Sequence, residues 1–324
     1  TDLDGDFRDA MLTLNTEISN FSGQGAEDYT LRATLHDGNK KTIKTISSER
    51  FSVPAGESRK ISLDEAIENP LLWSAEHPSL YHLTIELLSS SGTVLEVVGG
   101  RIGFKETEIR DQVFYLNGKP VKLNGINSHM QHPVLGHTMD EETIRKDMDL
   151  FKQFNINCVR TSHYPPVTRY LELADEYGIY IVDETGDEAH ATQQVSDNKE
   201  WEAMYRERAR KMVLRDRNHS SVLFWSAGNE SGEGTNICAV IDEGKKYDAT
   251  RFWMYGGNDF SHPCEEIIGP RYPKIDDLIS EVMLIPTAED PRPSFLDEYL
   301  AVTGNGGGAL DDYWDVFTKY PRSM

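Results

Sequence analysis

Two glutamates that each follow a short apolar run are the residues of this sequence best suited to chemistry. Glu230 comes shortly after the run at residues 222–225, and Glu298 comes shortly after the pair at residues 295–296. An apolar run bounded by turn residues is typical of a buried strand. We therefore expect both acids at the C-terminal ends of strands, where the chain leaves the core. Two acids at strand ends of a barrel or open sheet are the minimal set for cleaving a glycosidic bond.

This chemistry needs the two carboxyl groups to differ in charge. A retaining glycosidase uses one protonated acid to protonate the leaving oxygen and one ionised carboxylate, about 5 Å away, to attack the anomeric carbon. Arg160, at another predicted strand end, and Tyr272 could keep Glu298 ionised by charge and hydrogen bonding. Partial burial and the neighbouring negative charge would then raise the pKa of Glu230. Asn229 is adjacent to Glu230 and is suited to bind the sugar 2-hydroxyl. A separation of roughly 6.5–9.5 Å between the two carboxyl groups would instead indicate an inverting enzyme.

Structural interpretations of the same residues stay open. Arg160 could form an ion pair that only stabilises the fold, and Tyr272 could be a packed loop residue. His129, His132 and His163 could each be an ordinary hydrogen-bonded histidine.

The first 108 residues have the pattern of an antiparallel sandwich. Apolar and polar residues alternate along residues 29–35 and again along residues 81–87, and each run is followed by a turn sequence. Several such strands without helical periodicity are typical of an immunoglobulin-like β-sandwich. Trp73 is expected in its core.

Residues 109–324 change to alternating strands and helices. Asp140 can cap a helix whose apolar face is formed by Ile144, Met148, Phe151 and Phe154.

Further elements of the same kind follow along the chain. Gly178 is a suitable left-handed terminator for a second helix. Strands are expected at residues 157–160, 179–182, 222–225, 252–255 and 293–297, and helices at 201–213 and 237–247. This alternation predicts a parallel sheet, and polar residues after each strand favour a TIM barrel over an open sheet. About seven strands can be counted, and an eighth is not evident.

Six motifs in order give the sequence a family resemblance. They lie at residues 69–81, 116–129, 159–165 with 182–184, 228–230, 297–299 and 313–321. With these motifs the sequence resembles glycoside hydrolase family 2, which includes β-galactosidases and β-glucuronidases. The resemblance implies an immunoglobulin-like β-sandwich followed by a (β/α)8 TIM barrel that ends before its last strand.

The resemblance also implies roles for site residues. Glu230 would be the acid/base and Glu298 the nucleophile, and His163 and His129 would contact sugar hydroxyls. The expected activity is that of a retaining exo-β-glycosidase, with β-galactosidase as the first expectation and β-glucuronidase or a related exo-β-glycosidase as the alternative.

The sugar is less well defined than the reaction. Residues 304–306 are similar to the galactosidase branch, but Ala301 stands where well-known galactosidases carry a histidine near the sugar 6-hydroxyl. A function of another class, a non-catalytic carbohydrate-binding piece or an inactive fragment of a larger enzyme, remains an alternative.

A magnesium site is implied by the galactosidase branch of the family. Glu188 and His190 would join Glu230 around the ion, because hard cations take carboxylate oxygens readily. The same two residues could instead be solvent-facing loop residues, and no cofactor is required for the glycosidase chemistry itself.

Composition limits the classes of partner. The 324 residues include 33 basic and 54 acidic ones, for a net charge of −21. Such a field repels phosphate, so we expect a carbohydrate partner and neither nucleic acid nor a membrane. A homo-oligomer of the full-length protein and a cytoplasmic or periplasmic location are both left open.

The three cysteines, Cys158, Cys238 and Cys264, are odd in number and far apart. We expect them to form neither a disulfide framework nor a metal cluster. Cys158 and Cys238 lie in apolar stretches and are expected to be buried thiols.

Overall fold

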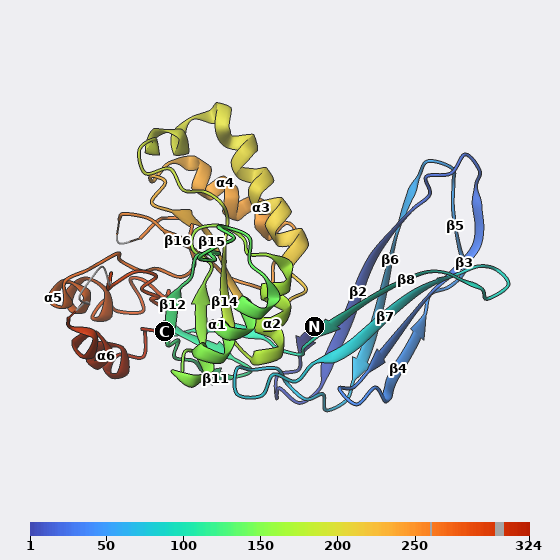
Figure 1. Ribbon diagram of the computed structural model, residues 1–324, viewed down its shortest axis with the longest axis horizontal. Coiled ribbons are helices and arrows are strands. Elements are labelled where there is room, and N and C mark those ends of the chain that lie inside the picture. The colour runs from blue at the N-terminus through green and yellow to red at the C-terminus, as the bar shows by residue number, and fades with distance from the viewer. Residues whose placement is uncertain (260, 302–307) are drawn as a thin grey trace. The chain divides into compact units, whose positions relative to one another are not determined.

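A computed structural model describes residues 1–259, 261–301 and 308–324. The chain divides into two compact units, Thr1–Glu106 and Thr107–Met324. The first is built from strands alone, and the second alternates strands with helices (Figure 1). The predicted fold class, a β-sandwich followed by a TIM-type barrel, is confirmed.

The first unit has two antiparallel sheets. One sheet has the order β1-β2-β6, and the other has the order β4-β3-β7-β8 with β5 paired to β3. Their bounds are β1 Asp2–Leu3, β2 Ala10–Ser19, β3 Ala26–His36, β4 Thr42–Ser47, β5 Phe51–Val53, β6 Ser58–Ile67, β7 Tyr81–Leu88 and β8 Val94–Ile102.

Alternating burial along these strands forms the core of the sandwich. Ala10, Leu12 and Leu14 point inward from β2 while the residues between them are exposed. They pack with Leu35 and others in one apolar cluster. Trp73 is fully buried, as predicted.

The second unit begins with a small antiparallel sheet formed by β9 (Thr107–Arg110), β10 (Val113–Leu116) and β11 (Lys119–Pro120). A parallel sheet then follows in chain order as β12 (Gly125–Asn127), β13 (Cys158–Arg160), β14 (Tyr180–Glu184), β15 (Val222–Asn229) and β16 (Trp253–Gly256). Because these neighbouring strands are parallel, their C-terminal ends meet at one edge.

Isolated parallel bridges extend this sheet beyond β16. They join Met254 to Ile267, Ile268 to Ser294, and Ser294 to Ser323. The segment that carries Glu298 therefore belongs to the same parallel path. The last bridge occupies the place of the eighth strand that the sequence pattern did not reveal.

The first helix, α1 (Glu141–Gln153), begins where the sequence predicted. The Asp140 carboxylate accepts a hydrogen bond from the Thr143 amide at 2.8 Å, and Ile144, Met148 and Phe151 are buried. The prediction was wrong for Phe154, whose side chain is 67% exposed. Phe154 is the C-cap residue, where the backbone departs from helical geometry and no longer continues the apolar face.

The other helices follow the predicted order. The second, α2 (Thr168–Tyr177), ends at Gly178 with φ of 69°, which confirms the left-handed terminator. The remaining helical segments are η1 Gln193–Asp197, η2 Lys199–Trp201, α3 Glu202–Asp216, α4 Thr235–Lys245, α5 Ile275–Leu278, η3 Ile279–Met283 and α6 Leu310–Lys319. Among the described residues, no helix combines the length and apolar character needed to cross a membrane.

The cysteine prediction was wrong in one respect. Cys238 and Cys264 form a disulfide with a Cα–Cα distance of 5.4 Å. Cys238 lies on α4 and Cys264 follows β16, and packing of the barrel brings these segments together although 26 residues separate them. Cys158 is a buried free thiol, as expected.

Candidate active site at the carboxyl ends of the parallel strands

Arg160 joins the ends of several strands into one site. It is the last residue of β13, and its side chain is 1% exposed. Its Nε donates to Glu184 at 2.6 Å, and Nη2 donates to the Asn229 side-chain oxygen at 2.9 Å. Its Nη1 donates to Glu298 at 2.9 Å and to Asn127 at 3.2 Å. Four segments are thus fixed around one guanidinium group.

Burial of this cation is compensated by surrounding acids. Desolvation alone would lower the pKa of Arg160, but the charges of Glu184, Asp297 and Glu298 raise it. Glu184 is fully buried as well, and although burial opposes ionisation, Arg160 and His163 hold its pKa below the usual value. The centre of the site is therefore a network of fixed charges.

Glu298 lies in a setting that favours its ionised form. Burial raises the pKa of this carboxyl, but the hydrogen bond from Tyr272 and the charges of Arg271 and Arg160 outweigh it, so that the pKa lies below the ordinary value. The Tyr272 hydroxyl donates to Glu298 Oε2 at 2.5 Å. Burial and the adjacent carboxylate raise the pKa of Tyr272 to about 12, so the phenol stays protonated and can donate.

Glu230 is held just beyond the end of β15. Its amide donates to the Gly256 carbonyl at 2.8 Å, and its backbone has a left-handed φ of 42°. Its carbonyl accepts a hydrogen bond from Gln193. Its carboxylate contacts His190 at 2.7 Å through Oε2 and Arg271 at 3.5 Å through Oε1.

Arg271 contacts both glutamates and so limits the distance between their carboxylates. Its Nη1 lies 3.0 Å from Glu298 Oε1 and 3.5 Å from Glu230 Oε1. The two carboxylate oxygens are therefore no farther apart than the sum of these distances. The greatest possible distance between these two oxygens therefore equals the lower end of the roughly 6.5–9.5 Å separation found in inverting glycosidases. The actual distance is shorter unless the three atoms lie on a straight line.

Gly256 at the end of β16 leaves room for this arrangement. A Cβ added at this position would collide with the Asp297 carboxylate and the Arg271 guanidinium. Arg271 Nη2 also forms a 2.6 Å ion pair with Asp297. Absence of a side chain at Gly256 thus lets the buried cation and its partners approach the strand.

The histidines are placed differently from one another. His163 lies 2.8 Å from Glu184 and 3.8 Å from Glu298, so it is part of the network. His129 lies beside it, with ring centroids 5.3 Å apart, and is exposed. Desolvation and the neighbouring His163 lower the pKa of His129, which favours its neutral form. His132 instead accepts hydrogen bonds from Val134 and Leu135 in its own loop.

Three further residues of the network were not singled out as site residues from the sequence. Glu184 and Asn127 lie in the motifs at predicted strand ends, and that location could have identified them as site residues. Arg271 directly precedes Tyr272, but nothing in its local sequence indicates that its side chain reaches two distant glutamates.

Of the three residues predicted to bind magnesium, His190 contacts each of the other two. Its Nε2 lies 3.3 Å from Glu188 and 2.7 Å from Glu230, and the Asn229 amide lies 3.3 Å from Glu188. Two carboxylates and one imidazole are ligand types that a hard cation keeping several waters accepts, but the three ligand atoms do not all lie within 4.8 Å of one another. Glu188 and His190 are both largely exposed.

Residues 304–306 lie outside the described residues, so the structure does not test their similarity to the galactosidase branch. Ala301, three residues after Glu298, is described and exposed.

Comparison with known proteins covers both units. The family model "Glycosyl hydrolases family 2, TIM barrel domain" matches residues 107–323, and the model "Glycosyl hydrolases family 2" matches residues 1–105. A β-galactosidase of Vibrio vulnificus (strain YJ016) is 36% identical over 336 residues, covering 99% of this chain and 32% of that protein. A β-galactosidase of Pectobacterium atrosepticum is 37% identical over 338 residues, with the same coverage. The chain thus spans about a third of the length of the curated relatives it matches.

Solved structures share the fold. A glycosyl hydrolase family 2 member from Bacteroides cellulosilyticus aligns with a TM-score of 0.83 at 24% identity, covering 98% of this chain and 43% of that one. A β-glucuronidase of Bacteroides uniformis aligns with a TM-score of 0.82 at 21% identity and the same coverage. At these identities the likeness extends to the fold alone.

Proposed function

The chain belongs to glycosyl hydrolases family 2, and on that basis we propose that the protein containing it is a retaining exo-β-glycosidase. The observation that carries the proposal is the position of Arg271 Nη1, 3.0 Å from Glu298 and 3.5 Å from Glu230. Two acids this close leave room for a sugar carbon between nucleophile and acid and resemble the retaining geometry of about 5 Å.

In the first step Glu298 acts as the nucleophile. Its carboxylate attacks the anomeric carbon, and the bond to the leaving oxygen breaks as that oxygen takes a proton from Glu230. Hydrogen bonds from Tyr272 and Arg160, together with the charge of Arg271, support the ionised Glu298 before attack. In the second step Glu230, now ionised, takes a proton from water, and this water displaces Glu298 from the sugar.

The remaining predicted residues would bind the sugar. The Asn229 side-chain oxygen is held by Arg160 and its amide nitrogen donates one hydrogen to Glu188, so the second hydrogen of that nitrogen is the one left for a sugar 2-hydroxyl. His163 and His129 would contact other hydroxyls. Hydrogen bonds to the 2-hydroxyl strengthen in the transition state and add to catalysis.

Galactose is the sugar that the relatives favour. Relatives named β-galactosidases are 36–37% identical over 99% of the chain. β-Glucuronidase is the second candidate, since Ala301 departs from the galactosidase pattern.

The test is hydrolysis of nitrophenyl β-D-galactoside and β-D-glucuronide by the intact protein. Glu298→Gln should abolish turnover of whichever glycoside is cleaved. Glu230→Gln should cost about 10²–10⁴-fold, and more for a methyl than for a nitrophenyl glycoside, because nitrophenol leaves without much protonation. Glu142→Gln, at an exposed position of α1, is the matched control. Cleavage of neither glycoside, or full rates in both site variants, would reject the proposal.

Magnesium is a separate proposal. Glu188, His190 and Glu230 would hold it, and the ion would supply a positive charge beside the acid/base carboxylate. Chelation of the intact protein should then lower activity, and added Mg²⁺ should restore it in the native protein but not in Glu188→Gln. Unchanged activity after exhaustive chelation would argue against the site.

A further inference from the structure

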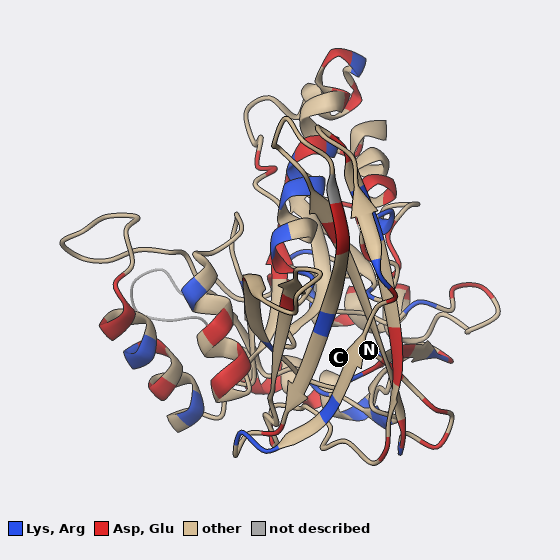
Figure 2. Ribbon diagram, turned by 90° about the vertical axis from the view of Figure 1, so that its right-hand side faces the viewer, with Lys and Arg blue, Asp and Glu red and all other residues tan. Residues whose placement is uncertain are grey.

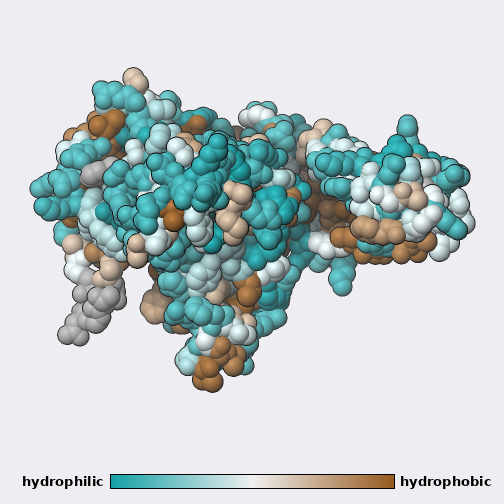
Figure 3. Space-filling model, turned by 90° about the horizontal axis from the view of Figure 1, so that it is seen from above, coloured by the Kyte–Doolittle hydropathy of each residue, from teal (hydrophilic) through white to brown (hydrophobic). Residues whose placement is uncertain are grey.

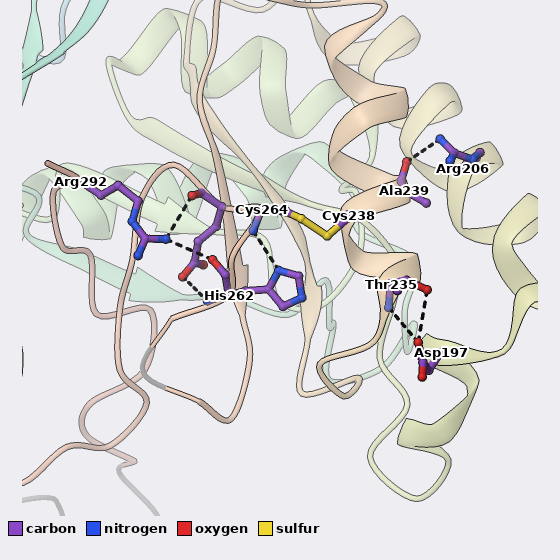
Figure 4. The surroundings of a disulfide bond; sticks show 9 residues. Asp197, Arg206, Thr235, Cys238, Ala239, His262, Cys264 and Arg292 are labelled. Carbon is purple, nitrogen blue, oxygen red and sulfur yellow. Dashed lines mark hydrogen bonds between the residues drawn. A yellow bond between two sulfur atoms is a disulfide. The ribbon is translucent and has the colours of Figure 1, made fainter. Parts of the chain in front are cut away.

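A second cluster of reactive side chains lies around the disulfide, apart from the glutamates. Sγ of Cys238, Sγ of Cys264 and a ring nitrogen of His262 all lie within 4.8 Å of one another. Figure 4 shows the imidazole of His262 beside the bond between the two sulfurs. Among the described residues, this is the group of histidine, cysteine and acidic side chains that converges closely enough to hold a metal ion.

The hydrogen bonds of His262 indicate which of its ring nitrogens could bind a metal. His262 Nδ1 accepts a hydrogen bond from the Cys264 amide at 3.3 Å, and the ring also bonds the backbone of Glu233. This pairing assigns the proton to Nε2, and the Nδ1 lone pair accepts from the Cys264 amide in a long hydrogen bond that a metal–nitrogen bond would replace. In metal-binding histidines, the ring nitrogen that does not bind the metal commonly donates a hydrogen bond to a backbone carbonyl, as the backbone of Glu233 provides here. Burial lowers the pKa of His262, which keeps the ring neutral and able to coordinate.

Both cysteine segments are anchored independently of the disulfide. In the turn after β16, the His262 amide donates to Glu265 at 2.8 Å, and Arg292 donates to the carbonyls of both residues. Glu265 lies deep in the fold, so this turn is held from within.

On the other side, α4 is held at two points that Figure 4 also shows. Thr235 donates to Asp197, and Arg206 donates to the Ala239 carbonyl next to Cys238. Breaking the sulfur–sulfur bond would therefore leave the two thiols close together.

We propose that Cys238, His262 and Cys264 form a binding site for a thiophilic divalent cation, with Zn²⁺ the ion whose coordination they match, and that the disulfide is the closed form of this site. Two sulfurs and one nitrogen are a tetrahedral zinc set with one position left for water. With Zn–S bonds of about 2.3 Å, the bound sulfurs would lie roughly 3.8 Å apart. Small side-chain rotations achieve this, and both cysteines are partly exposed, so the ion has access.

Opening of the site requires a dithiol reductant. The reductant gives two electrons and two protons to the disulfide, which becomes two thiols, while the reductant becomes a disulfide itself. Zn²⁺ then displaces one proton from each thiol and forms two Zn–S bonds and one bond to His262 Nδ1. The negative charges of Glu233 and Asp259 face the same imidazole and favour an approaching cation.

The first experiment measures Co²⁺ binding to the intact protein. Reduced, desalted protein should develop thiolate-to-cobalt charge-transfer absorption, and Zn²⁺ should abolish it. The oxidised protein and the Cys238→Ser/Cys264→Ser variant should not show it, whereas Cys158→Ala, at the buried free thiol, should behave as wild type. A signal in reduced wild type no larger than in the double variant would overturn the proposal.

The second experiment tests the same site without relying on cysteine variants. Reduced protein is alkylated with and without Zn²⁺, and peptides are analysed by mass spectrometry. Zn²⁺ should protect Cys238 and Cys264, and chelation should reverse the protection. His262→Asn should weaken Zn²⁺ binding by more than the roughly 10–100-fold that loss of an outer-shell partner causes. Equal alkylation with and without Zn²⁺, or unchanged affinity in His262→Asn, would contradict the three-ligand site.

Discussion

Arg160 is the side chain on which the geometry of the site depends most. It is buried among Glu184, Asp297 and Glu298, with N–O distances of 2.6, 3.5 and 2.9 Å. Removal of one partner from a buried ion pair costs about 3–5 kcal/mol because the other charge stays behind without compensation. Arg160→Met should therefore lower the melting temperature by many degrees as well as abolish activity.

Arg169→Met is the matched control for this prediction. Arg169 pairs with Glu141, Glu172 and Glu176, but its side chain and theirs are partly exposed. Exposed pairs contribute about 0–1 kcal/mol, so the control should melt close to wild type. Equal melting temperatures of the two variants would show that the Arg160 network does not stabilise the fold.

Tyr272 allows the ionisation of Glu298 to be tested through pH. Its hydrogen bond lowers the pKa of Glu298, so Tyr272→Phe should raise that pKa. The acidic limb of the kcat/KM profile should then move to higher pH. A hydrogen bond to a charged group is worth about 1.5–3 kcal/mol, and with Tyr272 47% exposed we expect a shift of roughly one unit or less.

Tyr299→Phe controls for loss of a hydroxyl nearby. The Tyr299 ring packs on Tyr313 and Phe317 against an apolar cluster. An unmoved acidic limb in Tyr272→Phe, or the same shift in both variants, would contradict the role assigned to Tyr272.

At the scale of elements, the first turn of α1 is fixed by a local signal. Asp140 caps the helix through a 2.8 Å hydrogen bond to the Thr143 amide. Loss of such a cap typically costs about 1 kcal/mol. Asp140→Ala should lower stability by that amount in thermal or denaturant unfolding, while Asp149→Ala, on the exposed face of the same helix, should have a smaller effect. A larger effect at Asp149 would indicate that general charge rather than capping matters.

Local signals explain which parts of the fold could be predicted. The cap at Asp140 and the terminator at Gly178 depend on a few adjacent residues, so the sequence indicates them directly. The contacts of Arg271 with two glutamates and the pairing of Cys238 with Cys264 arise only when separate βα units pack together. The eighth segment was missed because residues 321–324 form no apolar run, and only a single bridge at Ser323 places them in the sheet.

At the scale of the molecule, acidic residues outnumber basic ones by 54 to 33. The net charge is −21, and acidic residues occur along strands, helices and loops with basic residues between them (Figure 2). Hydrophilic residues dominate the face seen in Figure 3, with smaller hydrophobic groups among them.

From this charge we predict no binding to duplex DNA or to anionic vesicles at physiological salt, because both carry phosphate. Fluorescence anisotropy with labelled DNA and cosedimentation with vesicles measure this. Neutral vesicles and a basic DNA-binding protein serve as controls. Saturable binding that weakens as salt is raised would contradict the prediction.

The most direct test of the whole account is to trap the proposed covalent intermediate. The intact protein is treated with an activated 2-deoxy-2-fluoro-β-glycoside of the sugar it cleaves, and the labelled peptide is identified by mass spectrometry. We predict a glycosyl ester on Glu298, formed in wild type and absent in Glu298→Gln. A label on another residue, or turnover that inverts the anomeric configuration as followed by NMR, would contradict it.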